Sequence, residues 1–422
     1  MRAVDLTKGY LTECVIHHRL DESKNTHLEH LEDLIFNDGL PGGKQAIQYL
    51  QSFHEMLKGS AKTKFNLTTK WDGRPAVFVG TDPADGKFFV GTKSVFNKRD
   101  PLVNKSIEDI RANHEVEELQ EKLISSFTHL QKLNFKNKVV QGDLLFTEDS
   151  IQEANIKGEE YIVFKPNTII YAIPKDSNLA KDILRSKIGI VFHTEYVGGG
   201  ELADLSAKFG FDASSLGSNP DVWHRDAIIR DYSGQVTFTK EESEEMAQLI
   251  NNANQNLQAV TDLDFLKNND FGDDLRTRIK ASVNKIIKEL VAFEQDPKIF
   301  AERFIAEYKG TLKSAVERLK SDAGKVKKTQ LMLDGIKFLE SNQDQIEKAY
   351  IVYLDLIKAK EMIIKKLTNI RQIDTFVQNA EGDYDVTGEE GFVAVDHIGN
   401  AIKLVDRLDF SVKNFAAGNQ RA

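Results

Sequence analysis

The sequence predicts an α+β fold, in which an antiparallel-sheet domain is interrupted by an all-α helical insertion and preceded by an N-terminal helical hairpin. Three observations predict it. Short β-branched and aromatic segments dominate residues 65–238, helical periodicity replaces them over residues 240–379, and strand-like sequence returns near the end. Because a two-strand hairpin is unstable alone, we expect the last strands to pair with the early sheet.

We therefore divide the chain into four parts, which are residues 1–62, 63–239, 240–379 and 380–422. The 422 residues, 29% of them charged, are typical of a globular protein. We find no apolar run that could span a membrane and no secretory signal, so we expect a cytoplasmic protein without a membrane partner. Cys14 is the only cysteine, which excludes an internal disulfide and a thiolate metal cluster.

Residues 1–62 are predicted to form the helical hairpin. Apolar residues recur at helical spacing over His27–Asn37 and Gly43–Gly59, and the turn-rich segment Asn37–Gly43 separates the two helices. His27 and His30 are close enough in sequence to share a metal ion. Without a third ligand, we expect them on a polar helix face instead.

Residues 63–239 are predicted to form strands joined by turns. Each strand segment is short, is rich in β-branched or aromatic residues and is bounded by Gly, Asp, Asn or Pro. The segments are PAVFV, KFFVGTKSVF, KVVQGDLLF, EYIVFK, NTIIYAI and IGIVFHTEYV. Thr81–Lys87 carries a hairpin-turn signal between two of them, which favours a mostly antiparallel sheet.

Residues 240–379 are predicted to form a bundle of about five helices. Between Arg276 and Lys328 there are 14 Lys and Arg against 7 Asp and Glu, a local charge of +7 in a chain of net charge −9. Such a basic helical face favours binding to a phosphate backbone. The alternative is the solvated face of ordinary helices.

The segment Leu67–Val79, LTTKWDGRPAVFV, presents a lysine at the edge of the predicted sheet, just before a loop. A lysine amine is a nucleophile only when neutral, so it needs a lowered pKa and a fixed geometry. Asp72 is placed to orient Lys70, and Gly73 lets the backbone approach a bound phosphate. The alternative is a solvated hairpin tip with no function.

Lys70-x-Asp72-Gly73 resembles the nucleotidyl-acceptor motif of the covalent nucleotidyltransferases, which include ATP-dependent DNA ligases, RNA ligases and mRNA capping enzymes. Further elements that resemble this superfamily, and in particular bacteriophage RNA ligases, follow in the same chain order. They are Gln141–Leu145 (with Asp143 where the family has glutamate), Pro166–Tyr171, Glu390–Ala394 and the strand around Lys403. The resemblance implies that the sheet is a ligase-type nucleotidyltransferase (adenylation) domain.

The resemblance also implies ATP and Mg²⁺ (or Mn²⁺) as cofactors and assigns roles to several side chains. Lys70 would take AMP with Asp72 beside it, and Lys403 would neutralise phosphate charge and depress the pKa of Lys70. Glu390 and Asp143 would bind the metal ion through hard carboxylate oxygens.

The other expected contacts are with the sugar, phosphates and base of the nucleotide. Thr69, Arg74 and Lys93 are assigned to the nucleotide, although each cation taken alone is equally typical of a protein surface. Tyr171 or Phe146 would stack on the adenine. The alternative is that these two aromatic side chains pack only in the core.

One departure from the superfamily pattern favours RNA ligases, since we expect no oligonucleotide-binding barrel after Ala422. Arg74 also departs from the pattern: it stands at the fifth position of the first motif, whereas DNA ligases and capping enzymes have arginine at the sixth. The segment HLEHLEDLIF, near the start, more loosely resembles ligase-like proteins of large tailed bacteriophages.

The leading hypothesis is an ATP-dependent polynucleotide ligase that acts in nucleic-acid repair and joins RNA 5′-phosphate and 3′-hydroxyl ends through a lysyl-AMP intermediate. DNA ligase activity stays open. One alternative is nucleotidyl transfer to a protein or small molecule, and another is an inactive nucleotide or nucleic-acid binding module. The sequence decides neither between ATP and GTP nor the oligomeric state.

Overall fold

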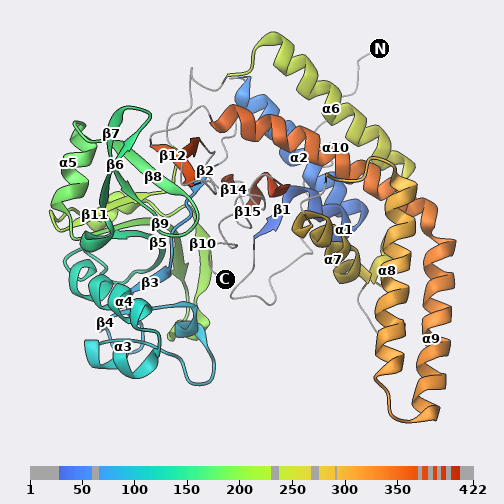
Figure 1. The fold of residues 1–422 in the computed structure, drawn as a ribbon, viewed down its shortest axis with the longest axis horizontal. Coiled ribbons are helices and arrows are strands. Elements are labelled where there is room, and N and C mark those ends of the chain that lie inside the picture. Colours follow the sequence, from blue (N-terminus) through green and yellow to red (C-terminus); the bar gives the residue numbers. More distant parts are fainter. Residues whose placement is uncertain are drawn as a thin grey trace, which may run out of the picture.

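The computed structural model describes residues 28–58, 66–229, 237–267, 275–289, 292–368, 373–378, 384–386, 391–395 and 401–408. Figure 1 shows a strand-rich part and a helical part, and between them lie strands from both ends of the chain. The mixed α and β composition with mainly antiparallel sheets is confirmed. The expectations for Cys14, His27 and Glu390 concern positions outside the described residues.

The largest sheet has six strands, in the order β10-β9-β5-β3-β4, and β11 pairs with β9. Its pairings are antiparallel except for the parallel pairing of β11. The strands are β3 (Ala76–Thr81), β4 (Phe88–Gly91), β5 (Val139–Thr147), β9 (Ile188–Val197), β10 (Ser206–Phe209) and β11 (Val222–Asp226). Helices α3 (Ile107–Asn113) and α4 (Glu117–Leu130) cover the face that carries Val77 and Val79.

A second sheet has five strands in the order β13-β12-β8-β7-β6. They are β6 (Gln152–Ile156), β7 (Glu159–Phe164), β8 (Ile170–Pro174), β12 (Asp374–Gln378) and β13 (Tyr384–Val386), with helix α5 (Asn178–Arg185) after β8. The predicted end of the helical region at residue 379 is wrong. Residues 374–378 form a strand because they find a partner in β8, about 200 positions earlier in the chain.

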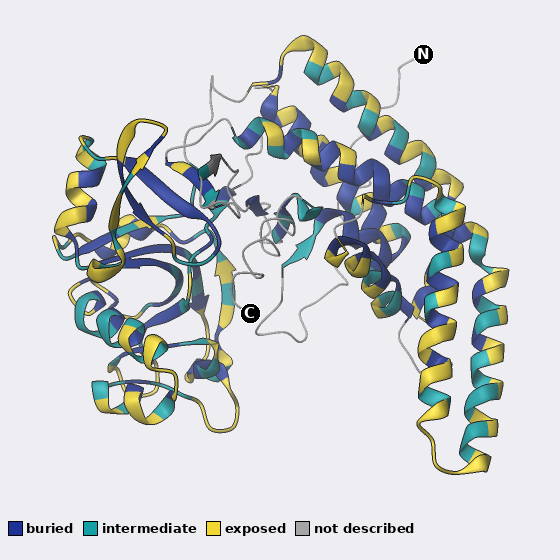
Figure 2. Cartoon of the chain, viewed as in Figure 1, coloured by how far each residue is buried: buried dark blue, intermediate teal, exposed yellow. Residues whose placement is uncertain are grey.

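The helical part confirms the expected number of long helices, since five α-helices are described between β11 and β12. They are α6 (Lys240–Ala259), α7 (Leu275–Lys288), α8 (Pro297–Glu317), α9 (Asp322–Ser341) and α10 (Gln343–Leu367). Figure 2 shows buried residues where α2, α6 and α10 pack together, whereas α8 and α9 project as an antiparallel pair with mostly exposed ends. None of the helices in the described ranges is long and apolar enough to cross a membrane.

The N-terminal part differs from the predicted hairpin at its start. Residues Glu29–His30 form a strand, β1, which is followed by a 3-10 turn (Leu31–Asp33), α1 (Leu34–Asp38) and α2 (Leu40–Leu57). The helix expected from His27 therefore begins only at Leu34, because β1 pairs with β15 and tertiary pairing overrides local periodicity. Helix α2 begins before Gly43 because Pro41 is tolerated in a first helical turn.

The third sheet joins the two ends of the chain, in the order β1-β15-β14-β2. Its other strands are β2 (Asn66–Lys70), β14 (Gly391–Val395) and β15 (Ala401–Leu404). The last strands do pair with an early strand, since β14 pairs antiparallel with β2. They form a separate sheet, however, and do not extend the sheet of β3, β5 and β9. One face of the sheet packs on the helical core through Leu67, Phe392, Ala394, Ile402 and Leu404.

Candidate functional site

Lys70 is the last residue of β2, and it lies directly opposite Gly391, the first residue of β14. Gly391 has a φ of +144°, and a Cβ atom there would lie 2.4 Å from the carbonyl oxygen of Leu404. This position therefore requires glycine. The chain thus brings the strand after residue 390 directly to the lysine of the first motif.

Lys403 lies on the same face of this sheet as Lys70. It pairs with Val393, Val393 pairs with Thr68, and Thr68 and Lys70 are two residues apart on one strand. Side chains at such positions share a face because strands have a period of two. Strand spacings of ~4.8 Å and a rise of ~3.3 Å per residue put the two Cα atoms roughly 12 Å apart. That separation is short enough for two lysine side chains to reach one ligand.

His30 on β1, which we did not expect in the site, pairs with Lys403 on β15. Its Nδ1 atom is buried and has no hydrogen-bond partner within the described part of the chain. Burial lowers the pKa of His30 well below its usual value, and the charges of Arg407, Lys360, Lys403 and Lys70 lower it further. The imidazole is therefore neutral at pH 7, and both lysines expected in the site act on it.

Asp72 is buried, and its carboxylate holds the loop after β2 against the segment before β8. Oδ1 accepts a hydrogen bond from Asn167 Nδ2 at 2.7 Å, and Oδ2 accepts from the backbone N–H groups of Thr168 at 2.7 Å and Ile169 at 2.8 Å. The backbone N–H of Asp72 donates to the Tyr171 hydroxyl at 2.8 Å. This geometry makes Asp72 a positioning residue for the loop that follows Lys70.

Both aromatic residues expected to stack on adenine are buried, with 1% of Tyr171 and 2% of Phe146 exposed. The Tyr171 ring lies 5.2 Å from that of Trp71, and the Phe146 ring lies 5.0 Å from that of Phe164, between ring centroids. Of the two roles considered for these residues, the geometry supports core packing. Tyr171 also fixes the backbone of Asp72.

Gly73 packs directly against Asp143. A Cβ atom at position 73 would lie 2.5 Å from Asp143 Cβ and 2.9 Å from the carbonyl oxygen of Leu144, so only glycine fits. Two backbone hydrogen bonds hold the loop there: Arg74 N–H donates to Leu144 O at 2.9 Å, and Leu144 N–H donates to Pro75 O at 3.1 Å. Asp143 thus lies beside the loop that carries the first motif.

His193 is a second residue that we did not predict, and it faces Asp143. Its Nε2 atom lies 3.6 Å from Asp143 Oδ2, and the two side chains are 25% and 20% exposed. Its Nδ1 atom lies 2.7 Å from the hydroxyl of Thr194. The only signal in the sequence was a histidine within the otherwise apolar strand IGIVFHTEYV.

The three other residues expected to contact the nucleotide lie on different elements of the fold. Arg74 follows Gly73 and is exposed. Lys93 is exposed in the 3-10 turn after β4, at the end of the sheet where β3 begins. Thr69 lies on the opposite face of β2 from Lys70, and its backbone N–H donates to Ala227 O at 2.8 Å.

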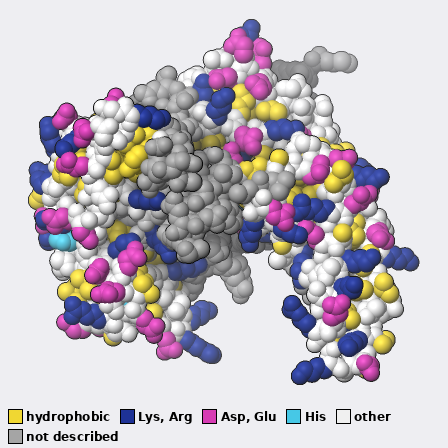
Figure 3. All heavy atoms as spheres, viewed as in Figure 1, with side chains coloured by type: hydrophobic (Ala, Val, Ile, Leu, Met, Phe, Trp, Pro, Cys, Tyr) yellow, Lys and Arg dark blue, Asp and Glu magenta, His cyan; other side chains and the backbone are white. Residues whose placement is uncertain are grey.

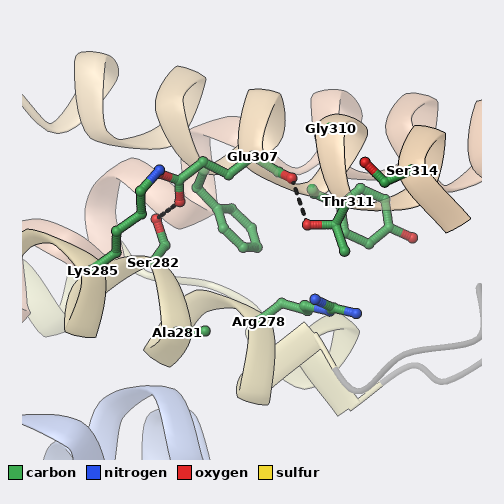
Figure 4. A pocket seen from close by; sticks show the side chains of 10 residues that line it. Arg278, Ala281, Ser282, Lys285, Glu307, Gly310, Thr311 and Ser314 are labelled. Atoms are coloured by element: carbon green, nitrogen blue, oxygen red, sulfur yellow. Dashed lines mark hydrogen bonds and ion pairs between the residues drawn. The ribbon is translucent and has the colours of Figure 1, made fainter.

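A separate pocket of about 460 Å³ lies between α7 and α8, and none of the expected site residues lines it. Figure 4 shows Ser282 and Lys285 directed at the carboxylate of Glu307, with Arg278 farther along the pocket. Ser282 Oγ donates to Glu307 Oε2 at 2.6 Å, and Lys285 Nζ lies 3.0 Å from Glu307 Oε1. The acid in this pocket is thus neutralised by its own neighbours.

Three comparisons with known proteins complete the description. Residues 25–419 match the model of a family described as a family of unknown function, DUF6267. No curated protein and no solved structure matches the chain. Within the described ranges, no group of three or more His, Cys, Asp or Glu side chains is arranged to hold a metal ion.

Proposed function

The chain belongs to the DUF6267 family. We propose that it is a covalent nucleotidyltransferase of the ligase type. It would use Lys70 to form lysyl-AMP from ATP and would then seal RNA ends. The observation that carries the proposal is the pairing of Lys70 with Gly391 across β2 and β14. This pairing joins the first motif to the strand that follows Glu390, and it puts Lys403 on the same face. Motifs separated by more than 300 residues therefore meet at one sheet.

The first step is an attack by the neutral amine of Lys70 on the α-phosphorus of ATP. A P–N bond forms, the P–O bond to the β-phosphate breaks, and pyrophosphate leaves. The ammonium must first lose a proton to water, because only the neutral amine is a nucleophile. Lys403 stabilises the negative charge on the phosphate oxygens as the bonds change.

Asp143, which is partly exposed beside Gly73, offers a carboxylate to the ion expected with ATP. A bound divalent cation neutralises charge on the phosphate oxygens. Asp143 would hold it through carboxylate oxygens, and Glu390 is the second ligand that we proposed from the sequence. Asp72, by contrast, uses both carboxylate oxygens to fix the loop.

In the second step, an oxygen of the RNA 5′-phosphate attacks the AMP phosphorus, the P–N bond breaks and Lys70 is released. In the third step, the 3′-hydroxyl attacks the activated 5′-phosphorus, a phosphodiester forms and AMP leaves. Each step exchanges one bond to phosphorus for another, so ATP is the only energy source that the sequence of steps needs.

The helical insertion supports a polynucleotide as the acceptor. Figure 3 shows Lys and Arg side chains along the projecting α8–α9 pair. Near the bundle these cations are paired, as Arg303 is with Glu289 at 2.9 Å. Towards the tip, several cations of α8 and of the turn after it are exposed and take no part in the ion pairs of the described residues; they are Lys309, Lys313, Arg318 and Lys320. Exposed cations of this kind suit a phosphate backbone.

The decisive test is incubation with ATP labelled at the α-phosphate, together with Mg²⁺ or Mn²⁺. We expect label on the wild-type protein, in a bond that acid cleaves and alkali does not, as for a phosphoramidate. Lys70→Ala and Lys70→Arg should take no label, whereas the exposed control Lys181→Ala on α5 should be labelled like the wild type. A protein that stays unlabelled, or label that survives Lys70→Ala, contradicts the proposal.

The acceptor is identified by a chase. Labelled protein is isolated and mixed with RNA that carries either a 5′-phosphate or a 5′-hydroxyl. We expect label to move only to the 5′-phosphorylated RNA and joined strands to follow. Label that stays on the protein with both RNAs would favour a protein or small molecule as acceptor. Repeating the first step with each of the four nucleotides identifies the donor.

A further inference from the structure

A β-bulge in the largest sheet directs the side chain of His193 towards Asp143. Gln141 on β5 lies opposite Thr194 on β9, but the next residue, Gly142, lies opposite Phe192. His193 is therefore an extra residue on β9 with no partner across the strand pair. Such bulges redirect a side chain and are common beside active sites. Here the bulge brings the imidazole to Asp143.

The separation of the two side chains is within the range of an ion pair, and it also fits a shared ligand. The 3.6 Å between His193 Nε2 and Asp143 Oδ2 is too long for a hydrogen bond. Nitrogen and oxygen ligands that lie about 2.1 Å from one metal ion are about 3.0 to 3.6 Å apart at bond angles of about 90° to 120°. The observed 3.6 Å lies at the upper end of this range, which corresponds to a bond angle of about 120° at the ion.

The other ring nitrogen of His193, Nδ1, has the hydrogen-bonding environment that is common in histidines that bind a metal ion through Nε2. Nδ1 lies 2.7 Å from the hydroxyl of Thr194, a residue that is only 1% exposed. Histidines that bind metals commonly donate the second ring N–H to a nearby oxygen, which orients the ring. With Nδ1–H donating, the lone pair of Nε2 faces a carboxylate oxygen, and a cation between them would satisfy both.

We propose that Asp143 and His193 together bind a divalent first-row transition-metal ion, for which Mn²⁺ serves as the spectroscopic probe. An imidazole ligand favours such ions over Mg²⁺, which takes oxygen ligands. Both side chains are partly exposed, so water or phosphate oxygens can complete the coordination. The ion would lie next to Gly73, in the loop that follows Lys70. This assignment deepens the proposed function and rests on it only for the role of the ion, because binding is measured without nucleotide or RNA.

The test uses electron paramagnetic resonance of Mn²⁺ with the full-length protein. Free Mn²⁺ is titrated in the absence of nucleotide for the wild type, His193→Ala and His193→Gln, and the bound ion is examined for coupling to ¹⁴N. We expect nitrogen coupling from one imidazole in the wild type. Both variants should lose this coupling and bind Mn²⁺ about tenfold or more weakly.

The matched control is His129→Ala, which removes a part-exposed histidine at the end of α4. It should keep the nitrogen coupling and the affinity of the wild type. Circular dichroism and the unfolding midpoint verify that each variant is folded. His193→Gln is included because its amide can still meet the hydroxyl of Thr194 if the alanine variant fails to fold.

Three results would overturn the assignment: no bound Mn²⁺, bound Mn²⁺ without nitrogen coupling in the wild type, or coupling that survives in both folded variants of His193. The experiments distinguish failure of the metal-site proposal from failure of the proposed nucleotidyltransferase function. Loss of Mn²⁺ binding with intact labelling of Lys70 in Mg²⁺ would leave the proposed function standing. Mn²⁺ bound through His193 in a protein that takes no label from ATP would leave only the metal site.

Discussion

The ammonium group of Lys360 lies 2.6 Å from the carboxylate of Glu32, and both side chains are almost completely buried, with 2% and 0% exposed. Arg407 approaches the same carboxylate at 3.7 Å and binds Asp33 at 2.9 Å. Three segments that are distant in sequence, the turn after β1, helix α10 and the residues after β15, thus meet in one buried charged cluster. The cluster holds β1 and β15 in the sheet that carries Lys70, in which β14 lies between β15 and β2.

We expect Lys360→Met to lower the free energy of unfolding by about 3–5 kcal/mol, because it leaves the buried Glu32 carboxylate without its closest cation. Urea denaturation measures the effect. The control Lys348→Met removes an exposed partner of Asp344 and should cost less than about 1 kcal/mol. The double variant Glu32→Gln/Lys360→Met should cost less than the sum of the single changes. A cost below about 1 kcal/mol for Lys360→Met would contradict the assignment.

The buried Asp33 should make stability depend on pH. Burial raises the pKa of its carboxyl from 3.8 to about 6, although the charge of Arg407 opposes the shift. The folded protein therefore holds this proton more tightly than the unfolded chain does, so its contribution to stability is present below about pH 4 and is lost as the pH rises to about 6. A shift of this size corresponds to about 2–3 kcal/mol.

His30 acts in the opposite direction, since burial lowers its pKa and stability rises as the pH increases towards 6.5. The measurement is therefore the difference between Asp33→Asn and the wild type in urea unfolding from pH 4 to pH 7. The variant should gain about 2–3 kcal/mol relative to the wild type over this range. The exposed control Asp182→Asn should show a flat difference. A flat difference for Asp33→Asn as well would disprove the role of Asp33.

Local patterns were sufficient to predict much of the fold. Strands β5 and β9 lie within a residue or so of the expected segments, because each is a long apolar run that ends in turn residues. Strand β12 was missed because its partner is β8, which is distant in sequence. The start of the chain was taken for a helix because the pairing of His30 with Lys403 leaves no local signal.

The candidate site was predictable only where a residue type by itself points to its chemistry. Lys70 and Lys403 were identified from motifs, and the structure puts them on one face of a sheet. The bulge that turns His193 towards Asp143 depends on strand register, which the sequence of β9 alone does not contain. The contacts of Asp72 with residues 167–169 likewise depend on how two distant loops pack.

The close packing of Gly73 on Asp143 predicts that Gly73→Ala displaces the loop after Lys70. The added Cβ would lie 2.5 Å from Asp143 Cβ and 2.9 Å from a backbone oxygen, so the loop must move. A shift of about 1 Å near a reacting group can cost about 100-fold in rate. We expect a loss of that order in the rate of labelling from ATP. The control Gly200→Ala adds its methyl group to open space and should label normally.

Asp72→Asn tests the positioning role of Asp72. The amide has one acceptor oxygen in place of two, so at least one donor among Asn167, Thr168 and Ile169 loses its partner. An unsatisfied buried group costs about 1–3 kcal/mol, which the unfolding free energy should show. If Asp72 only positions the loop, the rate of labelling falls but its dependence on pH keeps its shape. A changed pH profile would show that Asp72 acts directly on the lysine.

The exposed cations at the tip of α8 and α9 predict a contribution to RNA binding that depends on salt. We expect the triple variant Lys309→Gln/Lys313→Gln/Lys320→Gln to bind single-stranded RNA more weakly. The slope of log K against log salt should fall by about 2, since each phosphate contact on a single strand contributes about 0.7. Fluorescence anisotropy at several salt concentrations measures both quantities.

The matched control for this triple variant replaces three exposed lysines of the strand-rich part, which are Lys87, Lys136 and Lys181. Because the two triple variants have the same net charge, equal losses of affinity and slope would show that the overall charge, and not the α8–α9 tip, attracts the RNA.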